Sequence, residues 1–385
     1  MNKKVLPILL AFLCMGFGDA AGPIVGLAKN TYNVSNFIAQ LLPFMGFIMF
    51  GLLSIPMGIF QDKHGKKRTL IVGYIVALIG VAIPIFGLDS FIILLPTFLL
   101  LGAGATILQV AGNPIMRDVS GKGNYSRNLS IGQFVKAIGS LAGPLLPAIA
   151  ARWMGADWRV IFPVFSIGIL ISLVSLVGTH IEESPETEEE PTTFKSSLGM
   201  LSNNYVLMMV LGIFIYVGAE VCMSSGIPLY LKDNFGIDIQ KMGVLGTGLF
   251  FTTLMIGRFL GGVILNWLKP EKFLLITSIL SILGILGLFI GNAIISVVSV
   301  VIIGFSFANV FPLIFSITVD RLPEKTNELS GLMITAIVGG ALLPPIMGFL
   351  QDLTNVTIGF LVPLAAICYV CWVAIKNYRI MTSEG

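Results

Sequence analysis

The sequence is poor in charge and in the residues that build metal or disulfide sites. Of its 385 residues only 11% are charged, whereas roughly 25% is usual in a soluble domain. Its two histidines, His64 and His180, lie at loop edges, so we expect no metal site and no cofactor. The four cysteines fall in apolar stretches and read as buried thiols. A basic, aromatic-rich surface is also missing, which argues against nucleic acid as a partner.

Apolar residues are abundant, at 56% of the chain, and they occur in long runs. A membrane-crossing helix needs about 20 such residues. The sequence predicts an all-α integral membrane protein with twelve helices, near 5–28, 37–60, 69–88, 91–116, 127–150, 158–179, 204–230, 242–265, 273–291, 294–318, 328–350 and 357–378. The first run carries Asp19 and is too long for a removable signal peptide.

The segment GIFQDKHGKKR, from Gly58 to Arg68, is a short basic hairpin between two apolar runs, which is typical of a cytoplasmic turn. A loop that merely follows the positive-inside rule is the alternative. A degenerate echo 204 residues later, at Gly262, Asn266, Lys269 and Lys272, favours a duplicated architecture. The pattern resembles the loop between helices 2 and 3 of the major facilitator superfamily. That resemblance implies a gate latch formed by Gly58, Asp62, Gly65, Lys66, Lys67 and Arg68.

Charge also predicts orientation and domain organisation. The side of the hairpin holds sixteen of the 23 lysines and arginines and the other side holds five, so we expect both termini in the cytoplasm. The acidic stretch EESPETEEEP cannot pack and indicates a solvated linker. We expect six-helix bundles at 1–180 and 204–385 and a cytoplasmic linker at 181–203; binding of calcium or a protein to the linker is the alternative.

Polar residues within the apolar runs are few, and each costs several kcal/mol at the bilayer centre. They should face the bundle interior: Asp19, Gln40, Gln109, Asn113, Gln133, Lys136, Glu220, Arg258 and Asn309. Asp19 corresponds to Glu220 at an offset of 201, and Gln109 to Asn309 at an offset of 200. Pseudo-symmetric helices would bring these groups to one central site. The alternative is hydrogen bonding between helices, which we favour for Gln40 and Arg258.

Five strings in order, VAGNPIM, SRNLSIGQFVKAIGS, YVGAE, FPLIFSI and GGALLPPIMGFLQD, resemble the fucose/galactose/glucose:proton symporter family over almost the whole chain. The resemblance implies two pseudo-symmetric six-helix bundles of the major facilitator fold and import of a neutral hexose or deoxyhexose with a proton.

Three positions depart from the fucose-type pattern. Gln109 replaces a helix 4 glutamate, Gly22 stands where the family has a helix 1 acid, and Lys136 replaces an asparagine. Glutamine cannot exchange a proton, so coupling would fall to Asp19 or Glu220. A buried Lys136 requires a carboxylate partner. We expect that partner to be one of these two acids; the alternative is the carboxylate of a sugar acid.

Together these features predict a secondary transporter, not an enzyme, that imports a monosaccharide by proton symport with alternating access and acts as a monomer. The expected substrate-binding residues are Gln109, Asn113, Gln133, Lys136 and Asn309, with Phe134 or Phe311 stacking on the sugar. A proton-coupled drug or metabolite exporter is the second possibility, because Gly139-x-x-x-Gly143-Pro144 partly resembles an antiporter motif. A sensor or a membrane-embedded enzyme is a third class.

Overall fold

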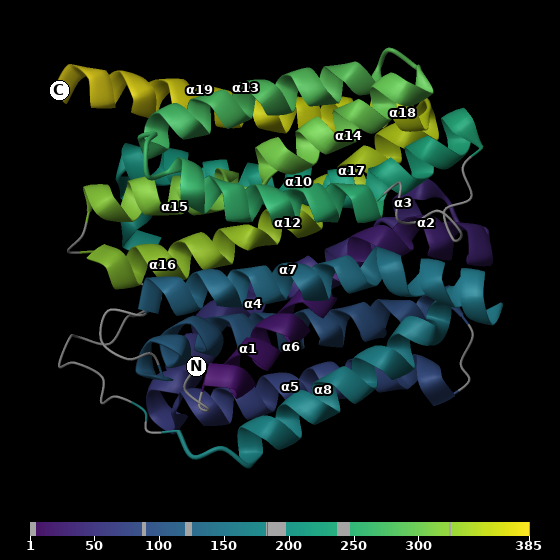
Figure 1. Ribbon diagram of the computed structural model, residues 1–385, viewed down its shortest axis with the longest axis horizontal. Helices are drawn as coiled ribbons and strands as arrows, with labels where there is room; N and C mark the ends of the chain where they lie inside the picture. Colours follow the sequence, from purple (N-terminus) through teal and green to yellow (C-terminus); the bar gives the residue numbers. More distant parts are fainter. Residues whose placement is uncertain are drawn as a thin grey trace.

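Long helices lie side by side in two stacked halves (Figure 1). This is a computed structural model, and it describes residues 5–86, 90–119, 125–181, 183, 198–236, 247–322 and 325–384. Among these residues there is no β-strand. An apolar chain in lipid must satisfy its backbone hydrogen bonds within each segment, so a helical fold is the expected outcome.

The N-terminal half contains six spans. They are formed by α1 (Val5–Phe17), η1 (Gly18–Ala20) and α2 (Ala21–Tyr32); α3 (Asn36–Ala39) and α4 (Leu41–His64); α5 (Lys66–Ala82) and η2 (Ile83–Phe86); α6 (Phe91–Val119); α7 (Tyr125–Ile149) and η3 (Ala150–Met154); and η4 (Trp158–Val160) and α8 (Ile161–Val177).

The C-terminal half contains the other six. They are formed by η5 (Met200–Ser202) and α10 (Asn204–Phe235); α12 (Thr247–Ile264); α13 (Pro270–Leu288); α14 (Ala293–Phe307) and α15 (Val310–Arg321); α16 (Thr326–Thr335), η7 (Ala336–Val338) and α17 (Gly339–Leu353); and α18 (Val356–Gly359) and α19 (Leu361–Glu384). Eleven of the twelve spans are long enough to cross a bilayer as described, and the eighth is described from Thr247 onward. The twelve-helix prediction is confirmed.

Each half has its own apolar core. One core joins residues of spans 1 to 6, and the other joins residues of spans 7 to 12. Four residues of the N-terminal half, Val25, Ala39, Phe47 and Phe50, belong to the second core. The two halves therefore meet mainly through spans 1 and 2, which pack against α10 and α17.

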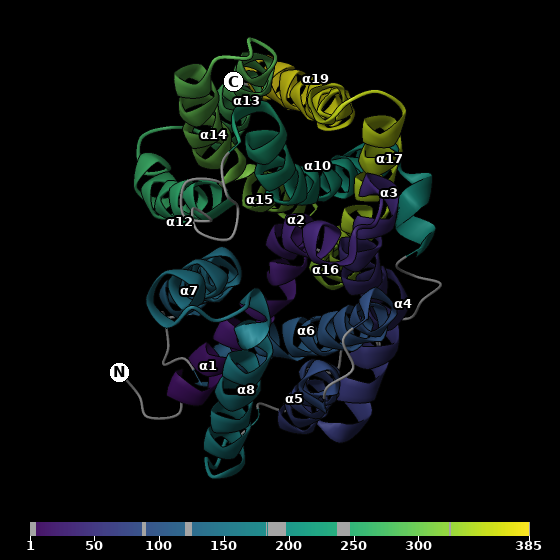
Figure 2. The ribbon, with the colours of Figure 1, turned by 90° about the vertical axis from the view of Figure 1, so that its right-hand side faces the viewer.

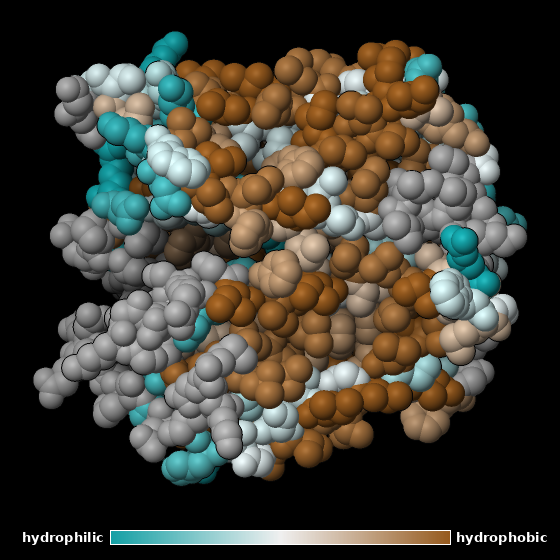
Figure 3. Space-filling view, in the orientation of Figure 1, coloured by the Kyte–Doolittle hydropathy of each residue, from teal (hydrophilic) through white to brown (hydrophobic). Residues whose placement is uncertain are grey.

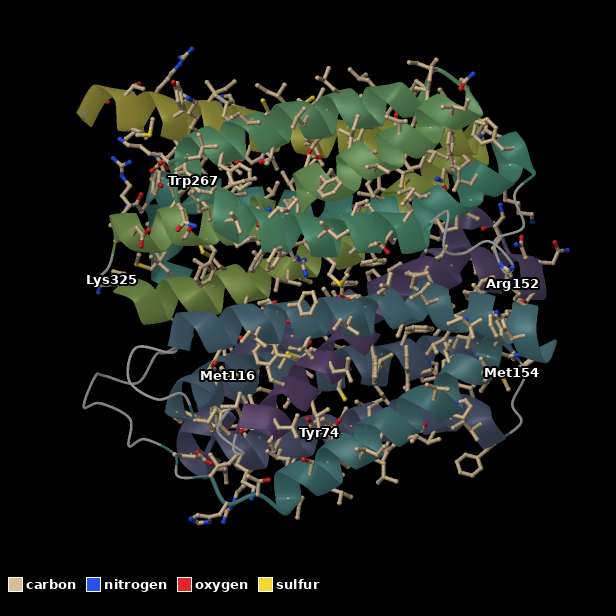
Figure 4. All side chains as sticks on the ribbon, in the orientation of Figure 1. Tyr74, Met116, Arg152, Met154, Trp267 and Lys325 are labelled. Carbon is tan, nitrogen blue, oxygen red and sulfur yellow. The ribbon has the colours of Figure 1, made fainter. Side chains whose placement is uncertain are left out.

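The outer surface shows a broad apolar belt with polar residues at its two edges (Figure 3). Trp153 and Trp267 are largely exposed at opposite edges, as expected for aromatic residues at the two membrane interfaces. Figure 4 shows Trp267 and Lys325 at one end of the molecule and Arg152 and Met154 at the other. We call the end with the basic hairpin the hairpin end and the opposite one the far end.

Span 1 and α7 approach backbone to backbone through glycines. A Cβ on Gly139 would collide with the carbonyl oxygen of Leu13, and a Cβ on Gly16 with the carbonyl oxygen of Lys136. A Cβ on Gly143 would stand 3.0 Å from Ala20. The Gly139-x-x-x-Gly143 string thus serves close helix packing, as such small-residue motifs commonly do.

We therefore predict that Gly139→Ala lowers the free energy of unfolding by about 1–3 kcal/mol, because the extra methyl group pushes two packed helices apart. Gly262→Ala is the matched control, since no described atom lies within 4 Å of the position its Cβ would take. Thermal unfolding of the two purified variants in detergent measures the difference. Equal melting temperatures would contradict the packing role of Gly139.

Candidate functional site

Asp19 lies in η1, the single turn of 3-10 helix that interrupts span 1. The close packing of span 1 on α7 brings the hydroxyl of Ser140 to within 2.5 Å of Asp19 Oδ2, to which it donates. The same Ser140 oxygen lies 3.2 Å from the carbonyl oxygen of Lys136. Ser140 can therefore donate to either acceptor, and a charged Asp19 is the stronger one.

Lys136 extends from α7 towards α6, where its ammonium group donates to Gln109 Oε1 at 3.0 Å. The expected ion pair of Lys136 with Asp19 or Glu220 is wrong for this structure: among the described residues neither carboxylate lies within 4 Å of Nζ. Residues 109 and 136 are two of the three positions where the sequence differs from the fucose-type pattern. The glutamine oxygen can accept from the ammonium group without carrying a charge.

Glu220, in the middle of α10, faces Arg258 of α12 across 3.5 Å between Oε1 and Nη2. The two side chains are 19% and 26% exposed. One turn earlier on α10, the hydroxyl of Tyr216 donates to the carbonyl oxygen of Phe307 at 2.6 Å and fixes α10 to α14. Arg258 thus joins α12 to α10, as expected for a residue that ties helices together, and it is also the ionic partner of a candidate coupling residue.

The charged groups of the two halves face each other. Asp19 and Lys136 lie near enough for their charges to act on the carboxyl group of Glu220. Both are half-buried, as are Glu220 and Arg258, although all four lie in mid-span. Charged side chains at this depth must contact water or each other, so their partial exposure indicates a water-accessible space between the halves.

The expected sugar-binding amides are not all in this cluster. Asn113 lies one turn beyond Gln109, and its Oδ1 is buried without a hydrogen-bond partner among the described residues. Gln133 is half-buried on α7. Asn309 is only 6% exposed; its Nδ2 donates to the carbonyl oxygen of Gly257 at 2.8 Å and holds the break between α14 and α15 against α12.

The other candidates lie as follows. Phe134 is 43% exposed on α7, whereas Phe311 stacks on Phe315 with ring centroids 6.1 Å apart. Gln40 is fully buried, and its side-chain amide makes no hydrogen bond among the described residues, so the helix–helix hydrogen bond expected for it is not formed. It packs against Gly348, whose Cβ would stand 2.8 Å from Gln40 Cγ.

The basic hairpin is bound within its own half. Gly65 ends α4 with φ of +88°, a conformation that favours glycine. The Lys66 ammonium group lies 2.8 Å from Asp118 Oδ2 at the end of α6, and Lys67 Nζ donates to the carbonyl oxygen of Thr179 at 2.8 Å. Arg68 is exposed and Gly58 lies on α4; the side chain of Asp62 is outside the described part of the chain.

The beginning of the segment predicted as a linker, 181–203, contacts the basic hairpin. The carboxylate of Glu183 accepts the backbone N–H groups of Lys66 at 2.6 Å and of Lys67 at 3.0 Å. These are first-turn N–H groups of α5, which have no partner within the helix. Glu183 therefore caps α5 and joins the hairpin to the beginning of the linker. Residues 184–197 lie outside the described part.

Sequence reasoning missed Ser140, Asp118 and Glu183. Ser140 could have been found, because it lies four residues after Lys136 and so shares its helix face. Asp118 and Glu183 are separated from Lys66 by 52 and 117 residues, and no local pattern connects them.

Comparison with known proteins agrees with this architecture. Residues 8–345 match the Major Facilitator Superfamily. A putative glucose/galactose transporter of Helicobacter pylori (strain ATCC 700392 / 26695) is 28% identical over 401 residues, which cover 98% of each chain. The L-fucose-proton symporter of Escherichia coli (strain K12) is 22% identical over 93% of this chain and 88% of its own.

Solved structures show the same fold. FucP, a major facilitator transporter in the outward conformation, superposes with a TM-score of 0.69 at 19% identity and covers 97% of this chain and 99% of its own. A bacterial homologue of the human lysosomal transporter Spinster, inward-facing and unoccupied, gives 0.73 at 15% identity, with 98% and 96% covered. The chain, a multi-pass membrane protein, belongs to the Major Facilitator Superfamily.

Proposed function

We propose that this protein imports a monosaccharide, a hexose, deoxyhexose or related sugar, by symport with protons. The observation that carries the proposal is the half-buried set of charges to which both halves contribute: Asp19 and Lys136 on one side, Glu220 and Arg258 on the other. An ionisable cluster between two bundles can change its contacts when the bundles rock. The relatives described as glucose/galactose and fucose transporters supply the substrate class.

The N-terminal half offers both kinds of hydrogen-bonding group that a sugar hydroxyl requires. Because Lys136 can only donate, Gln109 must turn its oxygen towards the ammonium group, which leaves its Nε2 hydrogens to donate to the sugar. The unpartnered Oδ1 of Asn113 can accept a hydroxyl hydrogen. Gln133, half-buried on the same helix as Lys136, supplies a further amide. Asn309 shapes the site by holding α12.

Proton coupling falls to the two carboxylates. When a proton binds Asp19, the carboxyl group no longer needs the Ser140 hydrogen, and that hydroxyl can turn to the carbonyl oxygen of Lys136. Protonation of Glu220 would weaken its attraction to Arg258 across the site. Each step changes contacts between helices, so it can bias the populations of the inward-facing and outward-facing states.

The protein would lie in a bacterial inner membrane as a monomer, with both termini and the linker in the cytoplasm. The excess of lysine and arginine at the hairpin end supports this orientation. The hairpin end is then the inner end and the far end is the outer end.

Uptake of labelled sugar into proteoliposomes, driven by an imposed proton gradient, tests the proposal. The panel should contain neutral hexoses, deoxyhexoses and sugar acids, with dye efflux measured in parallel. Uphill uptake of a neutral sugar that collapses with an uncoupler is the expected result. Dye efflux without sugar uptake would support an exporter instead.

Lys136→Gln distinguishes the substrate classes. If Lys136 orients Gln109 and balances the two acids, the variant keeps its affinity for a neutral sugar within roughly threefold. Its uptake profile moves to higher pH, because the lost positive charge no longer favours the charged form of Glu220. Loss of binding restricted to sugar acids, with neutral sugars bound by neither form, would overturn the neutral-sugar assignment. Lys272→Gln, on an exposed lysine at the inner end, is the matched control.

A further inference from the structure

The outer ends of spans 2 and 11 are joined by a side chain that reaches from one half to the other. Asp352, near the end of α17, accepts the backbone N–H of Asn36 at 2.8 Å on Oδ1 and that of Phe37 at 2.7 Å on Oδ2. Ser35 Oγ accepts the next N–H, of Ile38, at 3.2 Å. The first N–H groups of span 2 therefore depend on a carboxylate 316 residues away.

Close packing continues from this contact towards the membrane centre. The rings of Phe37 and Phe349 meet edge to face with centroids 6.5 Å apart. A Cβ on Gly348 would stand 2.8 Å from the Asn36 carbonyl oxygen. Deeper in the interface, a Cβ on Gly340 would stand 2.8 Å from the Phe47 ring. Figure 2, which faces the outer end, shows α2 and α3 lying against α10 and α17.

The Asp352 sequence repeats the start of the basic hairpin. GFLQD at 348–352 matches GIFQD at 58–62 in its glycine, glutamine and aspartate. Span 2 ends with its copy at the inner side and span 11 ends with its copy at the outer side, as in an inverted repeat. The two copies therefore occupy corresponding places at opposite faces of the membrane.

The two copies differ in their surroundings. Gly348 is packed tightly against span 2, whereas no described atom lies within 4 Å of the place of a Cβ on Gly58. The outer copy is therefore closely packed between spans 2 and 11.

We propose that Asp352 is the outer latch of the transport cycle, an inference that rests on the proposed transport function and orientation. Asp352 holds the outer end shut by capping span 2 and must release Asn36 and Phe37 before the outer end can open. It therefore stabilises the state in which the outer end is closed.

The latch is suited to repeated opening. Asp352 is exposed, so its carboxylate and the released N–H groups can exchange their hydrogen bonds for bonds to water. Loss of the latch should therefore change the balance between two folded states and leave the fold intact.

Distance measurements between spin labels test the proposal. Labels on Trp153→Cys and Ile294→Cys, two exposed outer positions in different halves, report opening of the outer end, in a background with Cys368 and Cys371 replaced by serine. Asp352→Asn should raise the ratio of outer-open to outer-closed molecules by roughly tenfold, because one charge-assisted acceptor is lost. Asp233→Asn, on another exposed outer acid, should leave the ratio unchanged.

A further variant separates a latch from a folding defect. Asn36→Pro removes one donor N–H at the first helical position, where proline is tolerated, and should act in the same direction as Asp352→Asn. An unchanged ratio in Asp352→Asn, or an equal shift in Asp233→Asn, would overturn the proposal.

Discussion

Asp19→Asn should abolish proton-driven accumulation of sugar while leaving exchange of sugar across the membrane measurable. The carboxyl group lies half-buried at the break in span 1, where a charge is costly unless it is solvated or paired. Asparagine has a similar shape and can still accept the Ser140 hydrogen bond, but it cannot take up a proton. The test compares uphill uptake with equilibrium exchange of labelled sugar in the same proteoliposomes.

Ser140→Ala provides a companion to that variant. Without the hydroxyl, Asp19 loses its hydrogen bond from α7 but keeps a carboxyl group that can take up a proton, so accumulation should persist. Asp233→Asn, on an exposed acid outside the site, controls for the loss of a negative charge. Undiminished uphill uptake by Asp19→Asn would exclude Asp19 as the coupling group and leave Glu220.

The positions of the membrane-spanning helices could be predicted, because a chain in lipid must form its backbone hydrogen bonds within each segment. Runs of about 20 apolar residues must become helices, and the spans are found where those runs occur. The breaks within spans were not predicted. The breaks at Gly18–Ala20 and at Ala308–Asn309 contain Asp19 and Asn309. A hydropathy pattern shows how apolar a segment is, but it does not show where a polar group interrupts the helix.

The members of the central cluster could be predicted more readily than their pairings. Burial cost alone singles out Asp19, Lys136 and Glu220. Which charge meets which depends on helix rotation and on the glycine contacts between span 1 and α7, and these follow from packing in three dimensions. Arg258 is an example. Its position in the sequence is equally consistent with a hydrogen bond between helices and with the ion pair to Glu220 that the structure shows.

The latch contacts illustrate a second limit. The echo of GIFQD in GFLQD is visible in the sequence, but it has an offset of 290 residues and an inverted topology, so a search for a parallel repeat passes over it. Its partners are the backbone N–H groups of Asn36 and Phe37, which carry no side-chain signature. Contacts of side chains with distant backbone can be recognised only when the helices are placed.

Arg258→Gln should have the second large effect, because it leaves Glu220 without its ionic partner. The ion pair is 19% and 26% exposed, so we discount the 3–5 kcal/mol typical of a fully buried pair to about 1–3 kcal/mol of stability. The carboxylate of Glu220 then repels Asp19, and a proton on either group relieves the repulsion. The uptake profile should therefore move to higher pH.

The double variant Arg258→Gln/Glu220→Gln separates charge balance from packing. It removes both charges, so it should recover much of the thermal stability lost in the single variant. The pH profile of its uptake should no longer depend on the Glu220–Arg258 pair. Arg159→Gln, which affects an exposed pair with Asp157 at 2.7 Å, is the matched control and should change melting and pH profile little. If the pH profile of Arg258→Gln coincides with that of the unmodified protein, Arg258 does not act on Glu220, and its role is confined to packing α12 against α10.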